Sequence, residues 1–353
     1  MARVDARGLP YRDWPDADKE LWDRLTLSGD PFDAAGPLSH LRPASLKTLQ
    51  NVYGFFLQHV RRIGLGLEEL EPHERPSLDV LRSFLASLDG LAPRTKAGYF
   101  AAMYSVMHAA SPDHDWTRLR AAKMNLERAA RKAGGLRDNS LIPAAPELLA
   151  LGRDFEADGY GCDRLRDRAE RIRDGLMVQF LAQYPLRLKN FAELEIGRTL
   201  RERGNRLIVC LPGSEVKNHR PLTMTLTSEI TDKLRAYIRD VRQLFPGGGD
   251  ASSGRLWLRF TYGPWEKASI GKHISRLTER GLGQRTTPHL FRHAAATTVA
   301  ISETADARII RPLLGHARPE TSEKYYIMAG QFEASRAFHK ALKATLVETD
   351  VER

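Results

Sequence analysis

The sequence T-P-H-L-F-R-H-A-A-A-T-T at Thr287–Thr298 begins the most chemically dense stretch of this 353-residue chain. R-P-L-L-G-H follows at Arg311–His316, and K-Y-Y follows at Lys324–Tyr326. Histidine, arginine and tyrosine side chains are thus gathered into helical patterns and short connections. No other segment of the sequence holds so many groups that can transfer protons and bind anions, so we expect the second half of the chain to be organised around this stretch.

The spacing at the start of the stretch predicts a helix. Pro288 suits the first turn of a helix, where no backbone N–H is needed, and Thr287 can cap that turn. His289 and Arg292 are three positions apart and therefore lie on one face. One face of a single helix would then carry both a proton acceptor and an anion-binding group.

A second short helical pattern, Arg308–Leu314, ends at Gly315, whose conformational freedom suits a helix C-cap. We therefore expect His316 to project from a helix end. Tyr325 follows His316 nine residues later.

This set of residues suits phosphoryl transfer. A guanidinium can hold the charged non-bridging oxygens of a phosphodiester with two parallel hydrogen bonds. A tyrosine needs a nearby base and a positive field to become a nucleophile, and histidine and arginine can supply these. For any one of these residues, a buried His–Arg cluster that only ties helices together is the alternative; the whole set favours catalysis.

The stretch resembles the catalytic core of the tyrosine recombinases, the phage-integrase family of site-specific DNA recombinases. The family's H-x-x-R box matches His289 and Arg292. Its L-G-H box matches Leu314–His316, and its nucleophile matches Tyr325. Tyr326 is the alternative nucleophile, because a Y-Y pair leaves the choice open by one residue.

The composition is compatible with a polyanionic partner. The chain has 54 Lys and Arg against 44 Asp and Glu, a formal net charge of +10, and a pI of about 9.7. Cys162 and Cys210 cannot form a disulfide framework, which favours a reducing compartment. Without a long apolar run or a signal-peptide pattern, the sequence predicts a soluble, unexported protein with no membrane partner. The resemblance implies a cytoplasmic, nucleoid-associated bacterial protein.

The pattern predicts a mainly α protein with a small antiparallel β-sheet, in two domains with appendages. Residues 1–39 form a helical extension, whose amphipathic segment Trp14–Leu25 packs on its own domain or contacts a neighbouring subunit. Residues 40–135 resemble the family's helical core-binding, SAM-like domain. Its four helical patterns are Pro43–Arg62, Ser77–Leu88, Pro93–Ala110 and Trp116–Ala133.

A linker at 136–146, within the glycine- and proline-containing sequence Gly134–Pro146, precedes an α+β catalytic domain at 147–346 and a tail at 347–353. The expected elements of the catalytic domain are a helix at Arg164–Tyr184, strands at Leu207–Leu211, Pro221–Leu226 and Leu256–Phe260, and helices at Ile270–Arg280 and Gln331–Leu346.

Basic residues supply candidate contacts to a DNA backbone. Trp116–Arg137 carries seven Lys and Arg against the single acid Glu127, a surface that is either merely solvated or tracks phosphates. His273 is a further residue that could face DNA. The DNA-binding candidates are Lys47, Arg94, Lys96, Arg118, Lys123, Arg131, Lys272 and Arg276.

The resemblance extends to two further catalytic positions. Arg187, in Y-P-L-R-L-K-N, stands where the family has its first catalytic arginine, after one helix and before another. The family often has an acid three positions later, but this chain has Asn190, whose amide supplies no negative charge. Lys217 matches the mobile lysine that the family places on a β-hairpin, although His219 or Arg220 could be mistaken for it.

The resemblance implies a mechanism that uses neither metal nor ATP, and no cofactor. Tyr325 forms a 3′-phosphotyrosyl link and frees a 5′ hydroxyl. The implied partners are a double-stranded DNA recombination site, three further copies of the chain in a tetramer on DNA and, as an option, accessory DNA-bending factors. The other implied roles are phosphate binding by Arg187, Arg292 and His316, proton acceptance by His289 and leaving-group protonation by Lys217.

Two other functions stay open. A DNA-binding protein of recombinase ancestry without catalysis would keep the same pattern. A metal-dependent hydrolase could use His289, His293 and His316 as ligands, but no glutamate completes an H-E-x-x-H motif and Arg292 would lie beside the cation.

Overall fold

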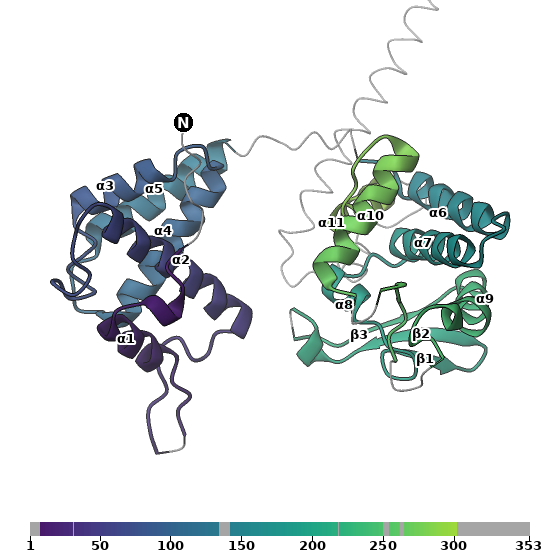
Figure 1. The fold of residues 1–353 in the computed structure, drawn as a ribbon, viewed down its shortest axis with the longest axis horizontal. Helices are drawn as coiled ribbons and strands as arrows, with labels where there is room; N and C mark the ends of the chain where they lie inside the picture. The colour runs from purple at the N-terminus through teal and green to yellow at the C-terminus, as the bar shows by residue number, and fades with distance from the viewer. Residues whose placement is uncertain are drawn as a thin grey trace, which may run out of the picture. The chain divides into compact units, whose positions relative to one another are not determined.

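Two compact units make up the chain, Met1–Arg137 and Asp138–Arg353 (Figure 1). The computed structural model describes residues 8–30, 32–133, 142–217, 219–249, 254–261 and 265–301. Most of the expected linker, the helical patterns Arg308–Leu314 and Gln331–Leu346, and the tail lie outside these residues. Within the described ranges, no helix is long and apolar enough to cross a membrane.

Five α-helices form the described part of the first unit, and their ends follow the predicted signals. Proline occupies the first turn of α2 and of α4, and the Ser77 side chain caps α3 by accepting a hydrogen bond from the Val80 N–H. A 3-10 turn at Tyr11–Asp13 precedes them. The helices are α1 (Asp16–Thr26), α2 (Pro43–Arg62), α3 (Leu78–Ser87), α4 (Pro93–Ala110) and α5 (Thr117–Ala133).

The apolar side of α1 packs inside its own unit. Trp14, Leu21, Trp22 and Leu25 are buried in one cluster with side chains of α2 and α4. The Trp14 ring lies edge-on to the Tyr53 ring of α2, with 5.2 Å between ring centroids. These four side chains therefore serve the core of the unit rather than a contact with a neighbouring subunit.

A buried ion pair fastens α1 to the segment before α3. Nη1 of Arg75 lies 2.7 Å from both carboxylate oxygens of Asp18, and both side chains are almost fully buried. The Tyr53 hydroxyl donates to the same carboxylate, at 2.5 Å. Burial, and next the charge of Asp18, raise the pKa of Tyr53 well above its ordinary value, so this hydroxyl stays a donor.

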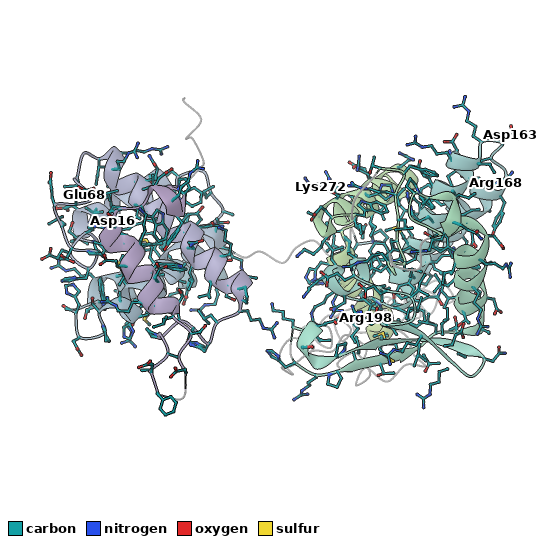
Figure 2. All side chains as sticks on the ribbon, turned by 60° about the horizontal axis from the view of Figure 1, so that its bottom comes forward. Asp16, Glu68, Asp163, Arg168, Arg198 and Lys272 are labelled. Atoms are coloured by element: carbon teal, nitrogen blue, oxygen red, sulfur yellow. The ribbon has the colours of Figure 1, made fainter. Side chains whose placement is uncertain are left out.

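Removing the acid should therefore destabilise the first unit. In Asp18→Ala the Arg75 guanidinium is left buried without a counter-charge, which we expect to cost about 3–5 kcal/mol. Hydrogen exchange of α1 and α2 amides in the full chain measures this loss. Asp16→Ala is the matched control, because Asp16 lies on the same helix, exposed to solvent, and pairs with Lys19 (Figure 2). Equal protection in the two variants would contradict the prediction.

The second unit packs helices against a small antiparallel sheet (Figure 1). Its strand order is β1-β2-β3, with Leu200 opposite Val209 and Val209 opposite Met224. A π-helical turn, Tyr237–Val241, continues α9. The elements are α6 (Ala145–Tyr160), α7 (Leu165–Gln183), α8 (Leu188–Ala192), β1 (Leu200–Arg203), β2 (Arg206–Leu211), β3 (Leu222–Thr225), α9 (Ser228–Ala236), α10 (Lys267–Leu282) and α11 (Pro288–Ile301).

The predicted fold class, mainly α with a small antiparallel sheet, is confirmed. Some elements differ from prediction. Leu256–Phe260 is not a strand: only Arg255 forms an isolated bridge, with Glu195, because the next residues turn into the core. α6, β1 and α9 were not predicted, and α6 starts inside the expected linker because Pro146 occupies its first turn.

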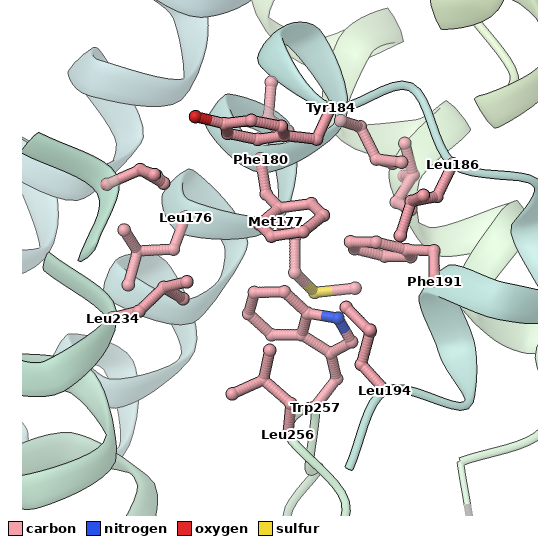
Figure 3. Close-up of a cluster of buried hydrophobic side chains, with 14 of the residues drawn as sticks. Leu176, Met177, Phe180, Tyr184, Leu186, Phe191, Leu194, Leu234, Leu256 and Trp257 are labelled. Atoms are coloured by element: carbon pink, nitrogen blue, oxygen red, sulfur yellow. The ribbon is translucent and has the colours of Figure 1, made fainter. Parts of the chain in front are cut away.

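The core of the second unit holds α8 in place. Phe180 of α7, Phe191 of α8 and Trp257 meet in a fully buried cluster, with 5.2 Å between the Phe191 and Trp257 ring centroids (Figure 3). The N–H of Leu256 donates to the Leu194 carbonyl, at 2.8 Å. Burying an aromatic side chain stabilises by about 1.5–3 kcal/mol, so this cluster fixes a helix too short to be stable alone.

Candidate functional site

Arg187 is the N-cap residue of α8, directly after the turn that ends α7. Pro185 stops α7, and the Arg187 carbonyl accepts the first helical hydrogen bond of α8, from the Phe191 N–H at 3.0 Å. The side chain is half-buried. Burial lowers the pKa of the Arg187 guanidinium from its ordinary value.

Arg292, on α11, reaches the same turn. Its Nη1 donates to the Pro185 carbonyl, two residues before Arg187, and the side chain is buried. The helix starts as predicted, with the Thr287 carbonyl accepting from the Leu290 N–H at 2.7 Å. The structure thus brings the backbone segments of two predicted catalytic arginines together.

His289 lies one turn before Arg292 and is exposed. Its Nε2 lies 3.3 Å from Nε2 of His293, and the rings meet edge-on. Since one nitrogen must donate and the other accept, this pairing favours at least one neutral ring. A neutral imidazole is the form that can accept a proton.

Lys217 lies in the connection between β2 and β3, as predicted, and is exposed. A 3-10 turn, Gly213–Glu215, starts this connection, and Val216 is buried in the core. His219 and Arg220, the two residues that could be mistaken for the lysine, are also exposed in the same connection. Because all three side chains are exposed, exposure does not distinguish them. Lys217 is preferred as the catalytic lysine because of the family resemblance.

Asn190 joins the connection that carries Lys217 to the helix that follows Arg187. Its Nδ2 donates to the Glu215 carbonyl, at 3.0 Å, and the side chain is buried. No spacing rule could have revealed this partner, because the two residues lie 25 positions apart.

The remaining catalytic candidates lie outside the described residues. These are His316 and the tyrosines Tyr325 and Tyr326. Within the described ranges, no group of three or more His, Cys, Asp or Glu side chains could hold a metal ion. His316, the third ligand of the metal-site alternative, is not among the residues described.

The DNA-binding candidates of the first unit differ in their surroundings. Lys96 pairs with Asp89, with 2.6 Å between Nζ and Oδ1. Lys123 lies 4.0 Å from the Glu127 carboxylate and over the Tyr104 ring. Their charges are partly compensated. The candidates whose side chains are exposed are Lys47, Arg94, Arg118 and Arg131.

On α10 of the second unit, the side chains of Lys272 (Figure 2) and Arg276 are exposed, one helical turn apart. His273 points the other way: its Nε2 lies 2.8 Å from Asp174 Oδ1, inside a buried cluster with Arg173. Burial raises the pKa of Asp174, but the charges of Arg173 and His273 outweigh it and leave the pKa lowered. His273 therefore holds α10 against α7.

Comparison with known proteins gives a family match over part of the chain. Residues 162–331 match the phage integrase family. Over 93 residues the chain is 38% identical to tyrosine recombinase XerD of Caulobacter vibrioides, which covers 26% of this chain and 27% of that protein. Over 95 residues it is 30% identical to tyrosine recombinase XerC of Anoxybacillus flavithermus, covering 27% and 31%. The chain thus spans under a third of these curated relatives.

Solved structures share the fold over a larger part of the chain. The XerH site-specific recombinase bound to palindromic difH substrate, a post-cleavage complex, has a TM-score of 0.55 at 16% identity, over 90% of this chain and 87% of that chain. The pre-cleavage complex of XerH with difH has a TM-score of 0.52 at 16% identity, over 80% and 77%. Both similarities concern the fold.

The contact of Arg292 with the turn yields a prediction on stability. In Arg292→Ala the Pro185 carbonyl loses a donor in a buried position, so we expect the free energy of unfolding to fall by about 1–3 kcal/mol. Urea denaturation monitored by hydrogen exchange of α7 and α11 measures it. Arg276→Ala, an exposed arginine of α10, is the control and should leave stability close to that of the wild type. A loss no larger than in this control would contradict the assignment.

Proposed function

We propose that this chain is a site-specific DNA recombinase that cleaves and rejoins DNA through Tyr325, because residues 162–331 match the phage integrase family. One observation carries the proposal. Two hydrogen bonds, Arg292 to Pro185 and Asn190 to Glu215, join the three segments that bear Arg292, Arg187 and Lys217.

The arginines suit the binding of the scissile phosphate. A guanidinium offers two parallel N–H donors to non-bridging oxygens, and its charge opposes the charge that develops as a fifth oxygen approaches phosphorus. Arg292 and His316 would complete the set around the phosphate.

Proton transfer balances the reaction. The Tyr325 hydroxyl gives its proton to His289 and its oxygen attacks phosphorus. The bond from phosphorus to the 5′ oxygen breaks, and the Lys217 ammonium protonates that oxygen as it leaves. The product is a 3′-phosphotyrosyl link with a free 5′ hydroxyl. Attack by another 5′ hydroxyl reverses the step, so no ATP is consumed.

The substrate and partners follow from this reaction. In two of the similar solved structures, XerH is bound to difH substrate. We propose a double-stranded recombination site for this chain, cut in the cytoplasm on chromosomal or mobile-element DNA. The basic candidates of α5 and α10 would contact its phosphates. Exchange between two duplexes requires four tyrosines, so we propose a homotetramer on DNA, with accessory DNA-bending factors as optional partners.

A suicide DNA substrate with a nick beside the cleavage position tests the nucleophile. The wild type should accumulate a covalent protein–DNA adduct, and Tyr325→Phe should form none, because the attacking oxygen is missing. Tyr326→Phe, one residue away, is the matched control and should retain the adduct. Loss of the adduct in Tyr326→Phe alone would move the nucleophile by one position. No adduct from the wild type would favour the non-catalytic DNA-binding protein.

Chelation separates the recombinase from the metal-dependent hydrolase. We expect adduct formation to proceed at an unchanged rate in excess EDTA, since guanidinium and ammonium groups supply the positive charge that a cation supplies elsewhere. The rate with and without added Mg²⁺ or Zn²⁺ is compared on the same substrate. A loss of more than about tenfold on chelation, restored by Zn²⁺, would support the hydrolase with His289, His293 and His316 as ligands.

A further inference from the structure

We propose that Asn190 is a positioning residue for Lys217. Its buried amide holds the connection between β2 and β3 at a fixed distance from α8, and this fixes the position of Lys217 relative to Arg187. This inference rests on the proposed function. It assigns a role to the one position where the chain departs from the family's acidic residue.

The platform for this contact is rigid. Asn190 is 5% exposed, and the adjacent Phe191 is fully buried between Phe180 and Trp257 (Figure 3). α8 therefore cannot shift without opening the core. The Nδ2 atom of Asn190 points from this helix to the Glu215 carbonyl, 3.0 Å away. Because α8 is fixed in the core, this hydrogen bond also restrains the backbone at Glu215.

Two further anchors hold the same connection. The Val216 side chain is buried in the core, 3% exposed. The Glu215 carboxylate lies 2.5 Å from Nη1 of Arg198, which also pairs with Glu195. Lys217 follows directly and is exposed. Its Cα is thus held by the two residues before it, while its side chain remains able to reach a substrate.

The chemistry of the contact requires a donor. A backbone carbonyl only accepts, so an amide N–H satisfies it, whereas an ionised carboxylate at this position would place oxygen against oxygen. This explains physically why an amide suits position 190 in this chain. Without the contact, we expect Lys217 to sample many positions and to protonate the leaving group less often.

A substrate with sulfur in place of the bridging 5′ oxygen isolates this effect. A thiolate leaves without a proton, since thiols have a pKa near 8.5, far below that of an alcohol. Protonation by a general acid contributes roughly 10²–10⁴-fold with oxygen as the leaving atom. Lys217→Ala should therefore be slow on the oxygen substrate and restored on the sulfur substrate.

We expect Asn190→Ala to cleave the oxygen substrate about 10–100-fold more slowly than the wild type, within the range that general acid catalysis contributes, and to recover on the sulfur substrate. Asn190→Asp, which keeps the shape and removes the donor, should behave in the same way. Arg198→Ala removes the ion pair to Glu215 and so loosens the connection, but Arg198 is exposed and the fold should be kept. We expect a smaller loss of rate on the oxygen substrate, which the sulfur substrate also restores. Thermal unfolding confirms that each variant is folded.

Gln179→Ala is the matched control. Gln179 is a buried amide that donates to a backbone carbonyl, that of Gly152 at 3.1 Å, but it lies between α6 and α7. Its removal should slow both substrates by the same factor or neither. If Asn190→Ala is equally slow on oxygen and sulfur, or Asn190→Asp keeps the full rate, the inference is overturned while the proposed function stands. If the wild type forms no adduct with either substrate, both fall.

Discussion

The turn between α7 and α8 is the constraint on which the rest of the site depends. Pro185 ends one helix, Arg187 begins the next, and the Pro185 carbonyl accepts the hydrogen bond from Arg292. A proline carbonyl at a helix end has no partner within its own helix, so it is open to a donor from elsewhere. A guanidinium from α11 fills that need, and the proximity of the two arginine-bearing segments follows from it.

Support for this turn comes from apolar packing rather than from charge. The packed rings of Phe180, Phe191 and Trp257 fix α8 in the core (Figure 3). The Leu256 N–H donates to the carbonyl of Leu194, just after α8, and so holds the segment that follows this helix. Few polar side chains are then needed at the site, because the backbone that carries each of them is already held in place. Pre-organisation of this kind is what electrostatic stabilisation of a phosphoryl transition state needs, since the donors do not have to be rearranged during the reaction.

Local signals in the sequence predicted the helices of the first unit and α7, α10 and α11 of the second, and they carried the family resemblance. Proline at the first turn of α2, α4 and α11 and the cap at Ser77 mark helix starts within one or two residues. Contacts between distant segments carry no such signal. The bond from Asn190 to Glu215, the inward turn of His273 to Asp174 and the loss of a strand at Leu256 all depend on packing across many positions. The roles of His316 and Tyr325 remain predictions.

The buried pair of Asp18 and Arg75 limits how the first unit can be joined to segments of other proteins in a chimaera. The two residues lie 57 positions apart, on either side of α2. A chimaera that joined the helices from α2 onward to a foreign leader would inherit the guanidinium without its carboxylate. The exchangeable module therefore includes α1, and any graft between homologues must carry both charges or replace both with apolar side chains of matching volume.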